Sequence, residues 1–187
     1  MRIISGSSKG KRILEPKDLN TRPLKDLTKE SIFNIITHSN KFSARLQNAN
    51  VLDLYSGVGS FGLECLSRGS SHLTFIENYS HVLSILKKNI FNLSYQEYSI
   101  IIEDNISDTF NFSNLKKKFD IIFMDPPYKE KKLHSVLDNV IRSDILNDNG
   151  IIIIHRHKKE NDEFPEKFNI LEQKLYGISK VIFGSYF

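Results

Sequence analysis

The segment Asp125-Pro126-Pro127-Tyr128 directly follows an apolar run, Phe119–Met124, that is typical of a buried strand. Proline fixes φ and lacks an N–H, so two prolines end the strand and stiffen the loop after it. The Asp125 carboxylate and the Pro126 carbonyl are then directed acceptors for the two N–H groups of an exocyclic amine. Tyr128 offers a ring on which an extruded base can stack. The segment predicts group transfer to the amine of a base, with a structural Asp-Pro turn as the alternative.

A glycine-rich turn follows a second apolar run, Val51–Tyr55, and precedes a helical pattern that ends near Gly69. Gly57 and Gly59 permit a tight turn and the approach of a ligand to the backbone, and Gly62 permits close helix–strand packing. This placement between strand and helix predicts a ligand site, although a purely structural turn has the same glycines.

Three acids narrow the choice of ligand. Glu77 ends the next apolar run, where a carboxylate can bind ribose hydroxyls, so NAD is one candidate. Asp53 argues against it, because an acid just before the glycines repels a pyrophosphate but attracts an ammonium group. Asp104 ends the third run and can accept an adenine amino group. An adenosine that carries an ammonium group is S-adenosylmethionine, whose sulfonium supplies an electrophilic methyl without a metal. The alternative for Glu77 and Asp104 is a helix cap or a solvated acid.

Strand and helix patterns alternate along the rest of the chain, which predicts a parallel sheet covered on both faces. Gly177 separates two final runs that leave no room for a helix and predict an antiparallel hairpin at the sheet edge. The further strands are expected at His72–Glu77, Ser99–Glu103, Gly150–His155, Ile170–Tyr176 and Ile178–Tyr186. Helices are expected from Leu24 to about His38, around Val82–Leu93 and Leu133–Ile141, and, more weakly, over Ser107–Lys118.

The N-terminal quarter of the chain is basic. Residues 1–45 hold ten Lys/Arg and four Asp/Glu, a local charge of +6, whereas the whole chain carries +4, so the remainder carries −2. Arg2–Ser5 and Lys11–Leu14 predict two short strands joined by a turn. We therefore expect a basic hairpin and loop in residues 1–23 and the main domain in residues 24–187. A polyanion-facing surface is one interpretation of the charge, and a solubilising face is the other.

The composition bounds the class of protein. A chain of 187 residues with 40% hydrophobic residues suits one globular domain. No apolar run approaches the roughly 20 residues that span a bilayer, and the N-terminus lacks a signal-peptide pattern. The single cysteine, Cys65, excludes an internal disulfide and is expected in the core. We expect a cytoplasmic monomer that binds neither membrane nor metal.

Several motifs together make the chain similar to the RsmD-type bacterial 16S rRNA guanine-N2 methyltransferases, over essentially its whole length. The motifs are Met1-Arg2-Ile3-Ile4-Ser5-Gly6 with Lys9-Gly10-Lys11, Asn20-Thr21-Arg22-Pro23, Glu30-Ser31-Ile32-Phe33-Asn34-Ile35, the glycine turn with Gly62–Gly69, Asp125–Tyr128 and Tyr176-Gly177. The resemblance implies a class I, Rossmann-like, seven-stranded sheet, mostly parallel, with an antiparallel C-terminal hairpin and an N-terminal β-hairpin extension. It also implies methyl transfer from S-adenosylmethionine to a guanine N2 in 16S rRNA, either free or in a small-subunit assembly particle.

The resemblance also assigns site residues. Asp125, Pro126, Pro127 and Tyr128 would be catalytic and would hold the guanine amine. The cofactor would be bound by Asp53, Tyr55, Ser56, Gly57, Gly59, Glu77, Asn78, Asp104 and Asn105, with Thr21, Arg22 and Pro23 over the entrance. RNA would be bound by Arg2, Lys9, Lys11, Arg12 and Arg22. Leu27 and Lys29 stand where the family often has arginine, which leaves the exact RNA contacts open because lysine lacks the guanidinium fork.

Other activities fit less well. An adenine or cytosine amine methyltransferase of DNA would need a recognition domain that so short a chain lacks, and a glutamine-N5 methyltransferase would carry Asn at position 125. A non-catalytic RNA-binding assembly factor would not need Asp125 and Tyr128. His155-Arg156-His157 is interpreted as a cluster at the rim of the protein, because no Cys or acid nearby completes a metal-ligand spacing. Lys129–Lys132 is either a phosphate contact or a solvated face.

Overall fold

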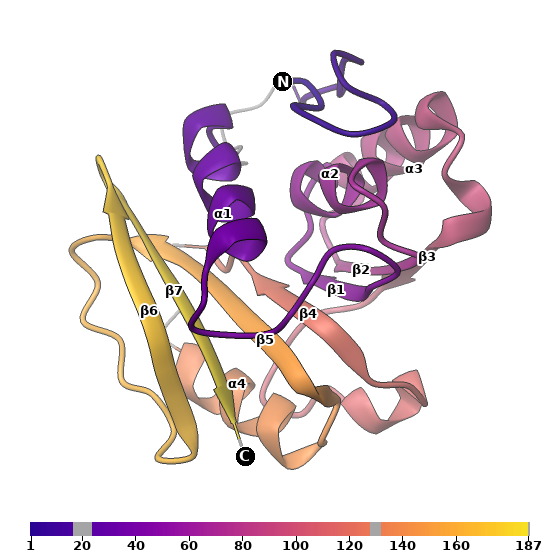
Figure 1. Ribbon diagram of the computed structural model, residues 1–187. Coiled ribbons are helices and arrows are strands. Elements are labelled where there is room, and N and C mark those ends of the chain that lie inside the picture. Colours follow the sequence, from indigo (N-terminus) through magenta and orange to yellow (C-terminus); the bar gives the residue numbers. More distant parts are fainter. Residues whose placement is uncertain (17–23, 128–131, 187) are drawn as a thin grey trace.

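Seven strands pair into one sheet, in the order β3-β2-β1-β4-β5-β7-β6, in the computed structural model, which describes residues 1–16, 24–127 and 132–186 (Figure 1). Neighbours among the first five strands are parallel, whereas β7 is antiparallel to both β5 and β6. The strands are β1 Asn50–Leu54, β2 His72–Glu77, β3 Ser99–Glu103, β4 Phe119–Met124, β5 Leu146–His157, β6 Phe168–Tyr176 and β7 Ser179–Tyr186. The class I Rossmann-like sheet with its C-terminal hairpin is therefore confirmed.

Helices cover both faces of the sheet (Figure 1). On one face lie α1 (Asp26–His38), α2 (Ser60–Ser67) and α3 (Ser80–Leu93), and on the other lies α4 (Leu133–Arg142) with a short 3₁₀ helix at Phe112–Leu115. Alternate residues of each strand point to opposite faces. Ile151 and Ile153 of β5 accordingly join the core beneath α1, α2 and α3, whereas Ile152 and Ile154 join the core beneath α4.

The expected helix over Ser107–Lys118 is wrong, because only the 3₁₀ turn at Phe112–Leu115 forms there. The side chains of Ser107 and Asn111 explain the difference, since they accept hydrogen bonds from the backbone N–H groups two residues ahead. Such local bonds compete with the backbone bonds of a helix. In the N-terminal segment the expected strand pairing is reduced to a single antiparallel bridge between Arg2 and Arg12.

One further expectation concerns burial. Cys65, a residue of α2, lies in the core, as expected, and burial raises the pKa of its thiol well above the ordinary value. In the described part of the chain, none of the helices has both the length and the apolarity of a membrane-spanning segment.

Candidate active site

The carboxyl ends of five parallel strands meet at one edge of the sheet, where such folds bind their ligands. Leu54, the last residue of β1, is in register with Ile76 of β2 on one side and with Met124 of β4 on the other. Met124 is in turn in register with Ile154 of β5. The residues that follow these positions, which include Glu77, Asp125 and His155, therefore lie along one line at this edge.

The three glycines of the turn after β1 differ in what surrounds them. Gly57 has φ +55°, and a Cβ added there would meet open space. Gly59 has φ +84°, but an added Cβ would come within 2.5 Å of Leu86 Cδ1. A glycine at this position therefore allows the left-handed backbone of the turn and the close packing of α3. At Gly62 an added Cβ would come within 2.4 Å of Leu73 Cδ2, which confirms its role in helix–strand packing. Of the three, Gly57 offers the open backbone that a ligand can approach.

Glu77 organises the backbone around the turn. Its carboxylate accepts hydrogen bonds from the N–H groups of Gly57 at 2.7 Å, Asn78 at 2.9 Å and Tyr79 at 2.8 Å. Tyr79 is the N-cap residue of α3, so the capping alternative considered for Glu77 is part of its role. A carboxylate has about four acceptor positions. Three are used, which leaves acceptor capacity for a ribose hydroxyl.

Asp53 lies inside the fold rather than on the turn's surface. Its carboxylate is 1% exposed and accepts the N–H of Gly62 at 3.0 Å. Burial raises the pKa of this carboxyl well above its ordinary value, and the charges of Asp125 and Glu77 raise it further. A cation bound at this edge would reduce the repulsion among the three acids.

The loops after β2 and β3 are joined by side chains that the sequence assigned to the cofactor. The amide of Asn78 donates to Asn105 Oδ1 at 3.1 Å, and Asp104 Oδ1 accepts the N–H of Asn105 at 2.7 Å. Asp104 and Asn105 are exposed, so this pair of loops has polar groups available to an adenine.

The donors and acceptors at this edge fit an adenosine with a cationic amino-acid tail. The backbone is open at Gly57, the Glu77 carboxylate accepts the N–H of Gly57, and Asp104 is exposed after β3. In addition, Ser56 Oγ is buried and has no hydrogen-bond partner among the residues that the structure describes. A ligand hydroxyl or carboxylate would satisfy it. Tyr55 lies in the same turn with φ 60°, and Thr21, Arg22 and Pro23 fall outside the described residues.

Asp125 is the first residue after β4, and its side chain is 21% exposed. Its Oδ1 lies 2.8 Å from His155 Nδ1, and His155 Nε2 lies 2.9 Å from Ser179 Oγ. Pro126 is buried, whereas Pro127 is exposed and its carbonyl accepts a hydrogen bond from Arg156 Nη1 at 3.2 Å. The stiff loop expected from two prolines thus contacts β5 through the Asp125 side chain and through the Pro127 carbonyl. Tyr128 lies outside the described residues.

The interpretation of residues 155–157 as a rim cluster is wrong for two of its members. His155 is 6% exposed and Arg156 is 2% exposed, and both contact the Asp-Pro-Pro loop. Among the described residues, no group of three or more His, Cys, Asp and Glu side chains could hold a metal ion. The position of His155 could have indicated this contact, because His155 ends the strand predicted from the sequence at Gly150–His155, at the same edge of the sheet as Asp125.

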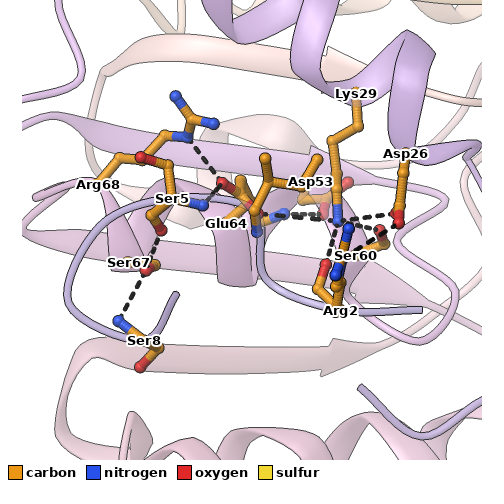
Figure 2. Close-up of polar contacts among 12 residues, drawn as sticks. Arg2, Ser5, Ser8, Asp26, Lys29, Asp53, Ser60, Glu64, Ser67 and Arg68 are labelled. Atoms are coloured by element: carbon orange, nitrogen blue, oxygen red, sulfur yellow. Dashed lines mark hydrogen bonds and ion pairs between the residues drawn. The ribbon is translucent and has the colours of Figure 1, made fainter. Parts of the chain in front are cut away.

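The N-terminal segment is fastened to α2 by a buried polar cluster, which we call the N-terminal anchor (Figure 2). Glu64 accepts the backbone N–H groups of Ile4 at 2.7 Å and Ser5 at 2.9 Å, and Arg68 Nε at 2.7 Å. Lys29 lies 3.7 Å from Glu64 and donates to the Arg2 carbonyl at 2.9 Å. Lys29 is fully buried, and this burial lowers the pKa of its amine, so it serves the fold rather than an RNA contact.

Both flanks of the undescribed residues 17–23 are attached beside the glycine turn. Before them, the amide of Asn89 bonds the carbonyls of Leu14 and Val58, and its Oδ1 accepts the N–H of Leu14. After them, Lys29 of α1 lies 3.4 Å from Ser60 Oγ at the start of α2. Arg2, Lys9, Lys11 and Arg12 are exposed on the anchored segment.

Comparisons with known proteins show the family of this chain. The profile of a family described as "Conserved hypothetical protein 95" matches residues 1–185. YlbH of Bacillus subtilis, which is provisionally named an rRNA methyltransferase, is 32% identical over 185 residues, covering 97% of this chain and 96% of YlbH. Ribosomal RNA small subunit methyltransferase D of Haemophilus influenzae is 28% identical over 179 residues, covering 95% of this chain and 90% of that protein. The chain belongs to this RsmD-type family.

Solved structures place the RsmD-type chain among methyltransferases by shape as well. A provisionally named methyltransferase of Escherichia coli, YhhF, superposes with TM-score 0.80 at 25% identity, covering 100% of this chain and 97% of YhhF. A provisionally named methylase of Haemophilus influenzae gives TM-score 0.72 at 26% identity, covering 98% of this chain and 96% of that one. The chain is a methyltransferase, and its cofactor is S-adenosylmethionine.

Proposed function

We propose that this enzyme transfers the methyl group of S-adenosylmethionine to the exocyclic N2 amine of a guanine in 16S rRNA. The observation that carries the proposal is the position of Asp125, one residue beyond β4 and beside the open glycine turn after β1. The names of the relatives support the substrate, since several are called ribosomal RNA small subunit methyltransferase D.

The chemistry required of the protein is mainly orientation. The lone pair of the guanine amine is delocalised into the ring, which makes the nitrogen a poor nucleophile. Asp125 Oδ2 and the Pro126 carbonyl accept the two N–H groups, so the lone pair turns toward the methyl group. The bound cofactor supplies that methyl as an electrophile on its sulfonium sulfur. As the N–C bond forms and the C–S bond breaks, the nitrogen loses one proton along its hydrogen bond to Asp125.

Binding of the rest of the substrate is assigned to other groups. Tyr128 stacks on the extruded guanine, and Glu77, Asp104, Asn78 and Asn105 hold the adenosine of the cofactor. Residues 1–23 form the RNA-facing part, with Arg2, Lys9, Lys11, Arg12 and Arg22 on phosphates, and residues 24–187 form the methyl-transfer domain. We further propose that the enzyme acts as a cytoplasmic monomer on free 16S rRNA or on an assembly particle.

Deleting the gene and analysing the host's 16S rRNA by mass spectrometry tests the substrate. We expect one N2-methylguanine to disappear and to return when the unaltered gene is supplied. A gene encoding Asp125→Ala should not restore it, whereas Asp148→Ala should, because Asp148 is an exposed acid in the amino-terminal part of β5. Unchanged N2-methylguanine would overturn the substrate, and loss of a methyladenine or methylcytosine instead would point to another base.

A further inference from the structure

The catalytic carboxylate of Asp125 is held by a two-step chain of hydrogen bonds, from Asp125 Oδ1 to His155 at 2.8 Å and from His155 to Ser179 at 2.9 Å. We propose that His155 is a positioning residue, which holds Asp125 so that Oδ2 faces the substrate amine, and that Ser179 fixes the orientation of the imidazole. This inference rests on the proposed function of Asp125 and adds the residue that aims it.

All three residues lie on the same face of the sheet. Asp125 continues the β4 alternation that places Phe123 under α1, α2 and α3, and His155 does the same after Ile153 in β5. Ser179 begins β7, two residues before Val181, whose Cα pairs with His155. Three neighbouring strands thus present the three side chains to one another, so the contact is set by strand register rather than by a loop.

The groups involved determine which atom donates and which accepts in these two hydrogen bonds. A carboxylate only accepts hydrogen bonds, so His155 Nδ1 carries the hydrogen and donates it to Asp125. In the neutral ring Nε2 then lacks a hydrogen and accepts the hydroxyl hydrogen of Ser179. The Asp125 carboxylate therefore selects the tautomer, and Ser179 donates to Nε2 and holds the ring in place, as an outer partner does for a ligating histidine.

Burial strengthens the two hydrogen bonds that link Asp125, His155 and Ser179. His155 is 6% exposed and Ser179 is 5% exposed, so water competes poorly for either bond. With Oδ1 held from inside the protein, a rotation of the carboxylate away from the substrate would leave a buried donor unpaired. Leaving a buried donor without its acceptor is unfavourable, which opposes this rotation.

The next residue holds the same loop from the other face. Arg156 donates to the Pro127 carbonyl at 3.2 Å and is itself fixed by Asp162, 2.8 Å from its Nη2. Asp162 also pairs with Lys180 at 3.3 Å. His155 and Arg156 point to opposite faces because they are consecutive in β5. Contacts from both faces of the sheet therefore hold the Asp-Pro-Pro loop, and of the two described here the His155 contact is the one to the carboxylate.

Two substitutions of nearly equal shape separate hydrogen bonding from packing. His155→Asn keeps an N–H donor at the δ position near that of Nδ1, whereas His155→Leu has the same branching without a donor. With S-adenosylmethionine and whichever of unmodified 16S rRNA or 30S particles the unaltered enzyme methylates, we expect His155→Leu to lower kcat about 100-fold, the scale of a 1 Å misplacement. The KM values should stay close to those of the unaltered enzyme, because the contact aims a reacting group and binds no substrate.

His155→Asn should recover most of the lost kcat, and His157→Leu, in the same strand, should keep the full rate. Equal kcat values for His155→Asn and His155→Leu, or a loss seen only in KM, would overturn the positioning role. If the unaltered enzyme methylates neither substrate, the proposed function fails, yet ¹⁵N NMR of histidine-labelled protein still decides the tautomer without turnover. A hydrogen on His155 Nδ1 supports the inference, and a neutral ring that carries it on Nε2 alone overturns it.

Discussion

The N-terminal anchor and the β5 end of the active site each centre on one acid held by buried partners, but the two acids are used differently. Glu64 is fully buried, and both of its oxygens are occupied, by backbone N–H groups and by Arg68 and Lys29. Asp125 keeps 21% of its side chain exposed, and His155 Nδ1 contacts its Oδ1.

The difference indicates what each acid does. An acid whose acceptor positions are all satisfied inside the protein contributes to a fixed arrangement of chain segments. An acid held by one oxygen at the edge of the sheet has an oriented second oxygen for a ligand. Breaking the first should therefore mainly change stability, and breaking the second should mainly change turnover.

The largest expected effect is on the anchor side of this comparison. Glu64→Ala leaves two backbone N–H groups without their acceptor and removes the ion-pair partner of the buried Lys29 amine. Loss of one partner of a buried ion pair costs about 3–5 kcal/mol. Urea unfolding measures the resulting fall in the free energy of unfolding. Asp125→Ala should cost far less, and Glu97→Ala, at an exposed acid, should cost almost nothing. Equal losses for Glu64→Ala and Asp125→Ala would remove the distinction between the two acids.

A smaller effect is expected at the basic surface that the anchor carries. Lys9 and Lys11 are exposed, so the double change to Glu should leave the fold intact. It should weaken binding to 16S rRNA and reduce the slope of log K against log salt by about one per lost phosphate contact. Filter binding at several salt concentrations measures both. Lys116→Glu with Lys167→Glu, just before the amino ends of β4 and β6, is the matched control. The same slope in both double variants would remove the anchored segment from the RNA site.

The smallest effect concerns Asp53, which lies beneath α2 and feels the charge of Asp125. Its raised pKa means that the folded protein holds this proton at a pH where the unfolded chain has lost it. Stability therefore falls as pH rises above the ordinary value of 3.8 and through the raised pKa. Asp53→Asn removes this loss, so the free energy of unfolding of the variant, relative to that of the unaltered protein, should grow with pH. Urea unfolding between pH 4 and 8 measures it, and a difference independent of pH would contradict the assignment.

The sequence was most informative where neighbouring residues decide the structure. The predicted bounds of His72–Glu77, Ser99–Glu103 and Phe119–Met124 are the observed ones, because each strand is a nearly unbroken apolar run that ends at an acid or just before one. The positions of Glu77 and Asp125 at one edge follow from the same runs. The helix expected over Ser107–Lys118 failed because short polar side chains compete for the backbone there.

The contacts that the sequence could not predict join residues far apart in the chain. His155 reaches Asp125 only through the register of β4 with β5, and a buried histidine looks the same in sequence as an exposed one. Lysine is usually found at the surface, yet the ion pair with Glu64, on a different helix, makes the burial of Lys29 possible. Both depend on pairings that only the folded chain specifies.

Methyl transfer to guanine N2 is tested most directly by incubating the purified enzyme with unmodified 16S rRNA or 30S particles and S-adenosylmethionine bearing a trideuterated methyl group. Digestion of the RNA and mass spectrometry should then show trideuterated N2-methylguanosine at one site, absent when Asp125→Ala replaces the unaltered enzyme. Label on another base or on protein, or no label with either substrate, would contradict the proposed function.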